Sequence, residues 1–65
     1  MATYAAQLEE QVKDNTLPID TQRGALRALI RERHSGNRAA FAALKRLAGN
    51  KRIPIDLARE AQRNL

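Results

Sequence analysis

The chain has 65 residues, a formal net charge of +5 at pH 7, one histidine and no cysteine. This length allows one domain (residues 1–65), and the lack of cysteine excludes disulfides, thiolate metal sites and a cysteine nucleophile. The N-terminus lacks the basic start of a signal peptide, and no uncharged stretch approaches the ~20 residues that span a bilayer, so we expect a soluble cytoplasmic protein without a membrane partner.

The first helix is predicted to run from Thr3 to about Asn15. Thr3 is a suitable N-cap, because its hydroxyl can accept a hydrogen bond from a backbone N–H of the first turn. Tyr4, Leu8 and Val12 recur every four residues and form the expected buried stripe. Asn15 tolerates the left-handed conformation and is expected to end the helix.

A second helix is predicted from Asp20, as its N-cap, to about His34. Its inward-facing residues are expected to be Leu26, Leu29 and Ile30. Gly36 suits the position just past a helix C-terminus, where the backbone turns left-handed, and Asn37 suits the next N-cap. Residues 35–37 are therefore predicted to form a tight turn.

Two further helices are predicted in the second half of the chain. Residues 38–48 carry apolar side chains at helical spacing and cations in the last turn, which suit the helix dipole. Gly49 and Asn50 are expected to close this helix, and Asp56 to cap a fourth. The residues expected in the core are Phe41, Leu44, Leu47, Ala48, Leu57, Ala61 and Leu65. No stretch alternates like a strand, so the predicted fold is all-α.

Residues 54–65 repeat residues 18–29 at an offset of 36, and seven of the twelve positions are identical. Each copy begins Pro-Ile-Asp, in which proline stops the preceding helix and aspartate can cap the next. Ile19 and Ile55 are expected to pack against the preceding helix of their own unit. The repeat predicts a small four-helix domain built from two similar αα-hairpins, about 1–35 and 36–65, related by a pseudo-two-fold axis.

Positive charge is concentrated after residue 20. Residues 1–20 hold one lysine against four acidic residues, whereas residues 21–65 hold the other eleven basic residues against three acidic ones. Nine of the twelve basic residues are arginine, whose guanidinium binds phosphate or carboxylate in a forked geometry. The candidate binding residues are Arg23, Arg27 and Arg31 on the second helix, Arg59 and Arg63 on the fourth, and Lys51 and Arg52 in the loop before it.

Two functions fit these arginine rows. In the first, a small basic regulatory or accessory protein binds DNA or RNA, because arginines of this kind contact phosphates without reading sequence. In the alternative, a protein–protein adaptor or inhibitor uses the arginine face to bind an acidic surface of a larger protein. A purely structural explanation remains, in which the rows are solvated and form the local ion pairs Asp20–Arg23 and Asp56–Arg59.

Other functional classes find little support in the sequence. A helix-turn-helix motif fails in both possible registers. With Gly36 as the turn glycine, polar residues fall at positions that should be apolar, and with Gly49 there, Pro54 falls inside the second helix. No catalytic triad, carboxylate pair, phosphate loop or metal-ligand spacing is present, so we expect no enzyme, cofactor or metal. Tyr4 and Phe41 are assigned to the core, which argues against base stacking.

Three further expectations concern packing and assembly. Gly24 is expected to allow the close approach of another helix. Glu9 and Glu10 are expected to form a surface separate from the arginines. Since a chain this short buries little surface and has no disulfide, a homodimer would add the stabilising contacts that it lacks.

Overall fold

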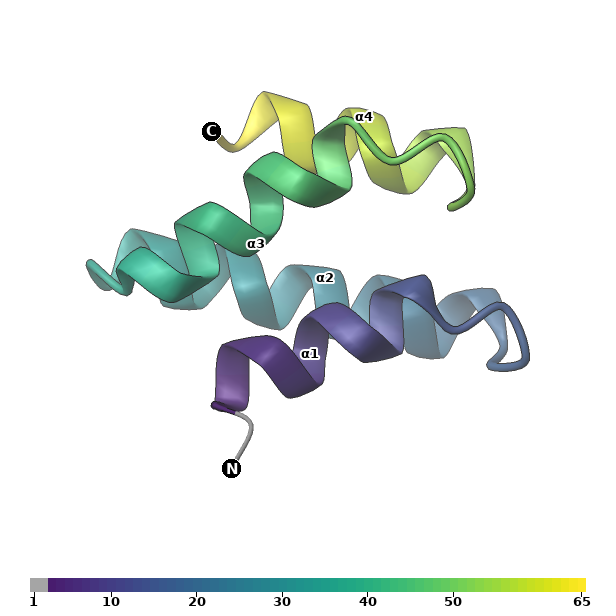
Figure 1. The fold of residues 1–65 in the computed structure, drawn as a ribbon, viewed down its shortest axis with the longest axis horizontal. Helices are drawn as coiled ribbons and strands as arrows, with labels where there is room; N and C mark the ends of the chain where they lie inside the picture. The colour runs from purple at the N-terminus through teal and green to yellow at the C-terminus, as the bar shows by residue number, and fades with distance from the viewer. Residues whose placement is uncertain (1–2) are drawn as a thin grey trace.

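Four α-helices make up the fold of residues 3–65, as the sequence predicts. The computed structural model describes residues 3–65 (Figure 1). The helices are α1 (Tyr4–Lys13), α2 (Ile19–His34), α3 (Arg38–Ala48) and α4 (Ile55–Arg63), and residues 3–65 contain no strand. The all-α prediction is confirmed.

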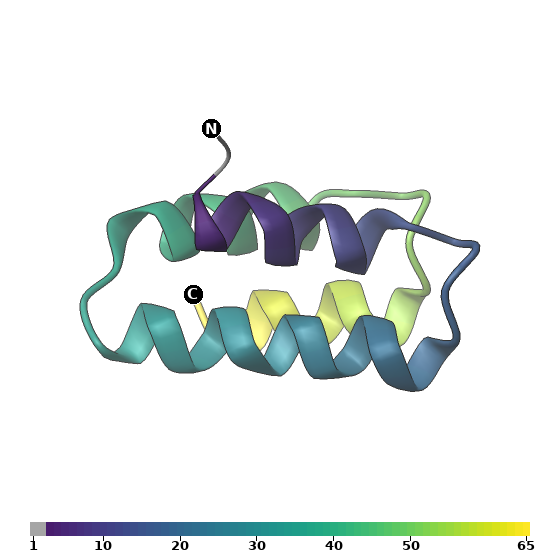
Figure 2. The ribbon, with the colours of Figure 1, turned by 90° about the horizontal axis from the view of Figure 1, so that it is seen from below.

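The helices lie in two layers, with α1 beside α3 and α2 beside α4 (Figure 2). The α1–α2 and α3–α4 loops lie at one end of the molecule, and the α2–α3 turn lies at the other (Figures 1 and 2). Within residues 3–65, α1 contacts α3 and α2 contacts α4, but α1 and α4 do not touch. A two-fold axis that exchanges the two hairpins would turn the contact between α2 and α3 into an equal contact between α4 and α1. Residues 3–65 have the first contact and lack the second, so the predicted pseudo-two-fold is wrong. The hairpins stack in the same direction, and their origin from one repeated unit stays a prediction.

The core is built largely from leucine and alanine. The largest fully buried side chains are Val12, Leu26, Leu29, Leu44, Leu47 and Leu57, all at positions that the helical spacing predicts. Leu8 and Ala61 are also buried as expected, while Ile30 and Ala48 pack partly buried against this cluster. The apolar spacing therefore identifies the main core correctly.

Three side chains that were expected in the core lie on the surface. Tyr4 is 56% exposed, Phe41 37% and Leu65 45%. The buried faces run instead through Ala5, Leu8, Glu9 and Val12 on α1, and through Ala40, Ala43, Leu44 and Leu47 on α3. Alanines at the contact let neighbouring helices approach closely, so the buried face shifts toward them and the two aromatic rings lie at its edge.

Both Pro-Ile-Asp segments begin their helix earlier than predicted. Pro18 and Pro54 are the N-caps, in extended backbone conformations with ψ of 149° and 137°. Their carbonyls accept the first N–H bonds of α2 and α4, at 3.0 and 3.1 Å for Pro18 and at 3.0 and 3.2 Å for Pro54. Asp20 therefore lies inside the first turn rather than at the cap, where its charge still suits the helix dipole.

The two isoleucines lie on the surface, although they were expected to pack against the preceding helix. Ile19 is 43% exposed and Ile55 64% exposed. Each is the first residue of its helix, and the core-facing positions begin only with Gln22 in α2 and Leu57 in α4. The isoleucines therefore lie at the first turns of α2 and α4, outside the buried core.

A buried glutamine joins α2 to the end of α1. Gln22 is 3% exposed, and its Nε2 donates to the carbonyls of Val12 and Asp14, each at 3.0 Å. These carbonyls belong to the C-terminal end of α1, where intrahelical partners are missing. Helix α1 ends at Lys13, its C-cap Asp14 has φ of −81°, and no non-glycine residue in 3–65 has a positive φ, so the predicted left-handed closure at Asn15 is wrong.

The α2–α3 turn follows the prediction closely. Gly36 adopts φ of +92° and donates to the carbonyl of Arg33, while the N–H of Asn37 donates to that of Glu32. This pair of bonds is the Schellman closure of a helix. The side chain of Asn37 then accepts from the N–H groups of Ala39 and Ala40 and so caps α3. One residue therefore completes α2 and starts α3.

Gly24 does not have the role that the sequence suggested. It is exposed, and a Cβ added there would meet nothing within 4 Å. The expected close approach of another helix at Gly24 is therefore wrong.

Candidate nucleic-acid interface

The two arginine rows lie in the same layer of the structure. Arg23, Arg27 and Arg31 come from α2, and Arg59 and Arg63 from α4, the two helices that form one layer (Figure 2). All are exposed except Arg23, which is half-buried. With a rise of about 1.5 Å per residue, the row on α2 extends for about 12 Å. The layer therefore carries two neighbouring rows of guanidinium groups.

The local ion pairs that would make these rows purely structural are not formed. Among residues 3–65, neither Asp20 with Arg23 nor Asp56 with Arg59 makes a salt bridge. Arg27 instead reaches across to α4, where its Nε lies 3.8 Å from a carboxylate oxygen of Glu60. A single contact at this distance is weak, so it links the two helices without removing the positive charge of the row.

The structure does not gather all seven predicted residues into one cluster. Lys51 and Arg52 lie in the α3–α4 loop, at the end where α2 and α4 begin, whereas Arg31 lies near the opposite end of α2. A hydrogen bond of 3.5 Å from Asn15 Nδ2 to the carbonyl of Arg52 links this loop to the α1–α2 loop. Lys51 and Arg52 are exposed and extend the basic layer at one end only.

Most of the positive charge in the described chain lacks an ion-pair partner. The salt bridges within residues 3–65 are Lys13–Glu10, Arg27–Glu60 and Arg46–Glu9. Nine of the twelve basic side chains therefore have no acidic group within 4.0 Å in residues 3–65. This group includes four of the five arginines in the rows.

Glu9 corrects the prediction of a separate acidic surface. It is 7% exposed, and Arg46 of α3 binds it in a forked geometry with bonds of 2.8 Å from Nε and 2.7 Å from Nη2. The hydrogen bond from Arg46 is the main cause that lowers the pKa of the Glu9 carboxyl, against the opposing effect of burial. Glu9 is therefore part of the contact between α1 and α3, and only Glu10 of this pair lies on the surface.

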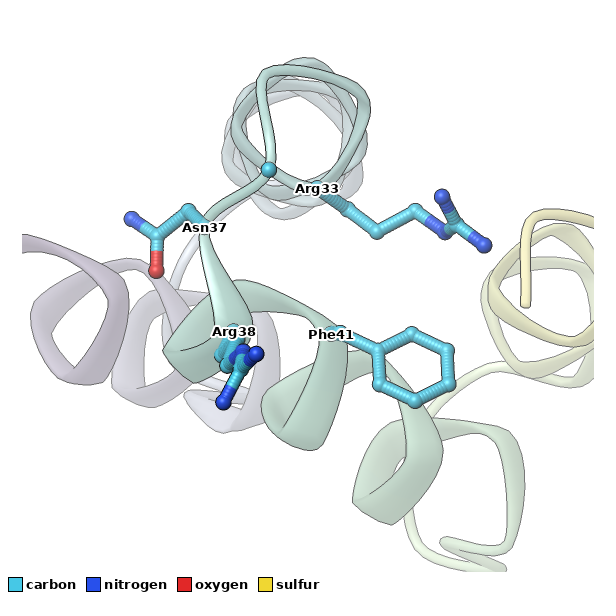
Figure 3. Close-up of a pocket in the computed structure, with 5 residues that line it drawn as sticks. Arg33, Asn37, Arg38 and Phe41 are labelled. Carbon is cyan, nitrogen blue, oxygen red and sulfur yellow. The ribbon is translucent and has the colours of Figure 1, made fainter.

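A second basic feature, not predicted from the sequence, lies at the α2–α3 turn. A hollow of about 220 Å³ is lined by Arg33, Gly36, Asn37, Arg38 and Phe41 (Figure 3). The guanidinium carbon of Arg33 lies 5.2 Å from the centre of the Phe41 ring, and Lys45 Nζ lies 5.8 Å from it. The sequence held a signal for the exposed position of Phe41. Ala40, Leu44 and Leu47 have helical spacing and form a buried stripe on α3 without it.

Neither a metal site, a membrane-spanning helix nor a known relative assigns a function to residues 3–65. Among residues 3–65, no three His, Asp or Glu side chains are grouped so that they could hold a metal ion. No helix within that range combines the length and apolar character that crossing a membrane requires. Comparison with protein-family profiles, with curated proteins and with solved structures gives no match. The basic layer is therefore the feature of residues 3–65 that bears most directly on function.

Proposed function

We propose that this protein binds nucleic acid through phosphate contacts made by the arginine rows of α2 and α4. The observation that carries the proposal is the unpaired charge of these rows: within residues 3–65, Arg23, Arg31, Arg59 and Arg63 have no acidic partner. Arginine forms forked hydrogen bonds to phosphate, and its planar group is more weakly hydrated than the ammonium of lysine. Lys51 and Arg52 extend the same contact toward the α3–α4 loop.

Phosphate contacts have a measurable signature in the salt dependence of affinity. Each neutralised phosphate releases counterions, so the slope of log K against log salt changes by about 0.9 per contact on duplex DNA and about 0.7 on a single strand. Contacts of this type position a protein without reading sequence. We therefore expect similar affinities for unrelated sequences and a steep loss of binding as salt rises.

The test is a fluorescence-anisotropy titration of labelled mixed-sequence oligonucleotides at several salt concentrations. The variants R31Q and R63Q each remove one positive charge from an arginine row. Neither arginine has an ion-pair partner among residues 3–65. The matched control is K13Q, which removes the same charge from α1 in the other layer. We expect R31Q and R63Q to weaken binding and to reduce the salt slope by about one contact each, and K13Q to do neither.

Two outcomes would contradict the proposal. The first is the absence of binding even at low salt. The second is an equal effect of K13Q and R31Q, which would show that net charge rather than the rows determines binding. If oligonucleotides do not bind, a pull-down tests the alternative, an acidic surface of a larger protein, for which one or two dominant arginines and a weaker salt response are expected.

A further inference from the structure

We propose that Phe41, together with Arg33 and Arg38, forms a subsite for an unpaired nucleotide, so that the protein prefers single-stranded over duplex nucleic acid. In this subsite the base of the nucleotide stacks on the Phe41 ring, and the backbone phosphates beside that base contact the two arginines. The inference rests on the proposed function and adds to it a substrate class that the arginine rows alone do not select.

The first argument is the position of Phe41. Phe41 is 37% exposed, although phenylalanine is usually placed inside a core. Figure 3 shows Arg33 and Phe41 extending side by side from α2 and α3 toward the C-terminal end of α4, drawn in yellow. Since α4 has 9 residues and α2 has 16, the first turns of α3 and the last turns of α2 are less completely covered than their other ends.

The second argument is the pair of cations at the ring. Arg33 and Lys45 place positive groups 5.2 and 5.8 Å from its centroid, within the range of cation–π contacts. The Nε of Arg33 is buried and has no hydrogen-bond partner among residues 3–65. A buried donor without an acceptor carries an energetic cost, so a phosphate would draw the Arg33 side chain outward. There Nε gains an acceptor, and the ring face that the guanidinium covers becomes free for a base.

The third argument is the chemistry of the hollow. Its lining combines two arginines with an aromatic ring and contains no carboxylate. The side-chain oxygen of Asn37 is already used by the N–H groups of Ala39 and Ala40, so it is not directed at an incoming anion. Arg38 is exposed at the first residue of α3. The hollow therefore offers donors and an apolar face, which are the two features that a nucleotide requires.

Stacking on a single ring distinguishes single strands from duplexes. In a duplex both faces of every internal base are covered by its neighbours, so Phe41 can reach only phosphates. In single-stranded nucleic acid the bases are accessible, and stacking on an aromatic side chain tolerates any base. The arginine rows would bind either form, whereas Phe41 would stack only on bases of the single strand.

The experiment compares three labelled probes of equal length: a mixed-sequence single strand, a strand in which every base has been removed (abasic), and the duplex. The abasic strand keeps every phosphate and loses the stacking partners. We expect the intact strand to bind about tenfold more tightly than the abasic strand, since one stacked base contributes a factor of about five or more. In the variant F41L, which keeps an apolar side chain, this ratio falls toward one.

Two further variants separate stacking from loss of structure. Y4L alters Tyr4, the other exposed aromatic, which lies on α1, and it should leave the ratio unchanged. F41W restores a ring, and because the chain contains no other tryptophan, its fluorescence reports directly on the site. We expect the intact single strand to quench F41W fluorescence and the abasic strand to leave it unchanged.

The possible results separate this inference from the function on which it rests. If all three probes bind with steep salt dependence but bind equally, and F41L changes nothing, the arginine rows bind nucleic acid and the Phe41 subsite is refuted. If no probe binds, both proposals fail. A preference for the intact strand that F41L removes and F41W retains supports both.

Discussion

Replacing Glu9 by glutamine tests the only forked ion pair between α1 and α3 in residues 3–65. E9Q keeps the shape of the side chain but removes the charge that receives two hydrogen bonds from Arg46, at 2.8 and 2.7 Å. Hydrogen bonds to charged groups contribute about 1.5–3 kcal/mol when buried. The side chain of Glu9 is 9% exposed, but that of Arg46 is 61% exposed, so solvent screens part of this interaction.

The expected cost of E9Q follows from these two facts. The glutamine oxygen can still accept one neutral hydrogen bond, and Arg46 can turn to water, so we expect a loss of about 1.5 kcal/mol. In a domain of this size that loss lowers Tm by about 6–12 °C. Thermal unfolding followed by circular dichroism measures it.

E10Q is the matched control, because it makes the same chemical change one residue away. Glu10 pairs with Lys13 at 3.0 Å, but its side chain is 74% exposed. An exposed pair one helical turn apart contributes less than about 0.5 kcal/mol. E10Q should therefore shift Tm by only a small fraction of the E9Q effect.

Acid provides a second readout with a defined sign. The pKa of Glu9 is lowered in the folded protein, mainly by its hydrogen bond from Arg46. The stabilisation is therefore complete above the unfolded-state pKa of about 4.3 and is lost as the pH falls through the lower folded value. The Tm gap between wild type and E9Q should close in acid. Equal shifts for E9Q and E10Q, or an E9Q gap that persists in strong acid, would refute the assignment.

Further stability changes follow from the backbone and the core, and denaturant unfolding measures each of them. G24A should stabilise the fold by about 0.5–1 kcal/mol, because Gly24 is exposed in a helix and an added Cβ meets nothing within 4 Å. G36A should destabilise it by about 1 kcal/mol, because φ at Gly36 is +92°. Changes of the same sign for the two variants would contradict this reasoning. Q22L should cost about 1–3 kcal/mol by leaving the carbonyls of Val12 and Asp14 without their donor, and a neutral result would show that water replaces the amide. L44A should cost about 2–5 kcal/mol, since Leu44 is fully buried, and a loss below 1 kcal/mol would mean that the helices close the cavity.

The sequence predicts much of this fold because its signals are local. The Gly36–Asn37 turn, the Thr3 cap and the leucine spacing each depend on a few neighbouring residues, and the structure has all three. The edges of the buried faces were misjudged because they depend on how closely helices approach. Ala40 and Ala43 allow α3 to pack on its small residues, which moves Phe41 to the rim.

The candidate site was predictable in composition but not in arrangement. Arg27 and Arg63 were identified from the repeat, yet nothing in the sequence indicates that Arg27 would reach Glu60 on another helix. Glu9 was assigned to the surface by its charge, and its partner Arg46 is 37 residues away. Such pairings are set by tertiary packing, which neither helical spacing nor caps reveal.

The same-direction stacking of the hairpins also determines how the molecule comes apart. Within residues 3–65, α2 and α3 each contact three other helices, whereas α1 and α4 each contact two and not one another. In stacked architectures of this kind, stability is largely a sum of nearest-neighbour terms, and local opening starts at the ends. Helix α4 contributes only Leu57 and Ala61 as buried residues, so we expect it to open before the other helices do. The backbone amides of α4 should exchange with solvent sooner than those of α2. Each time α4 opens, its arginine row loses its fixed position beside the row on α2.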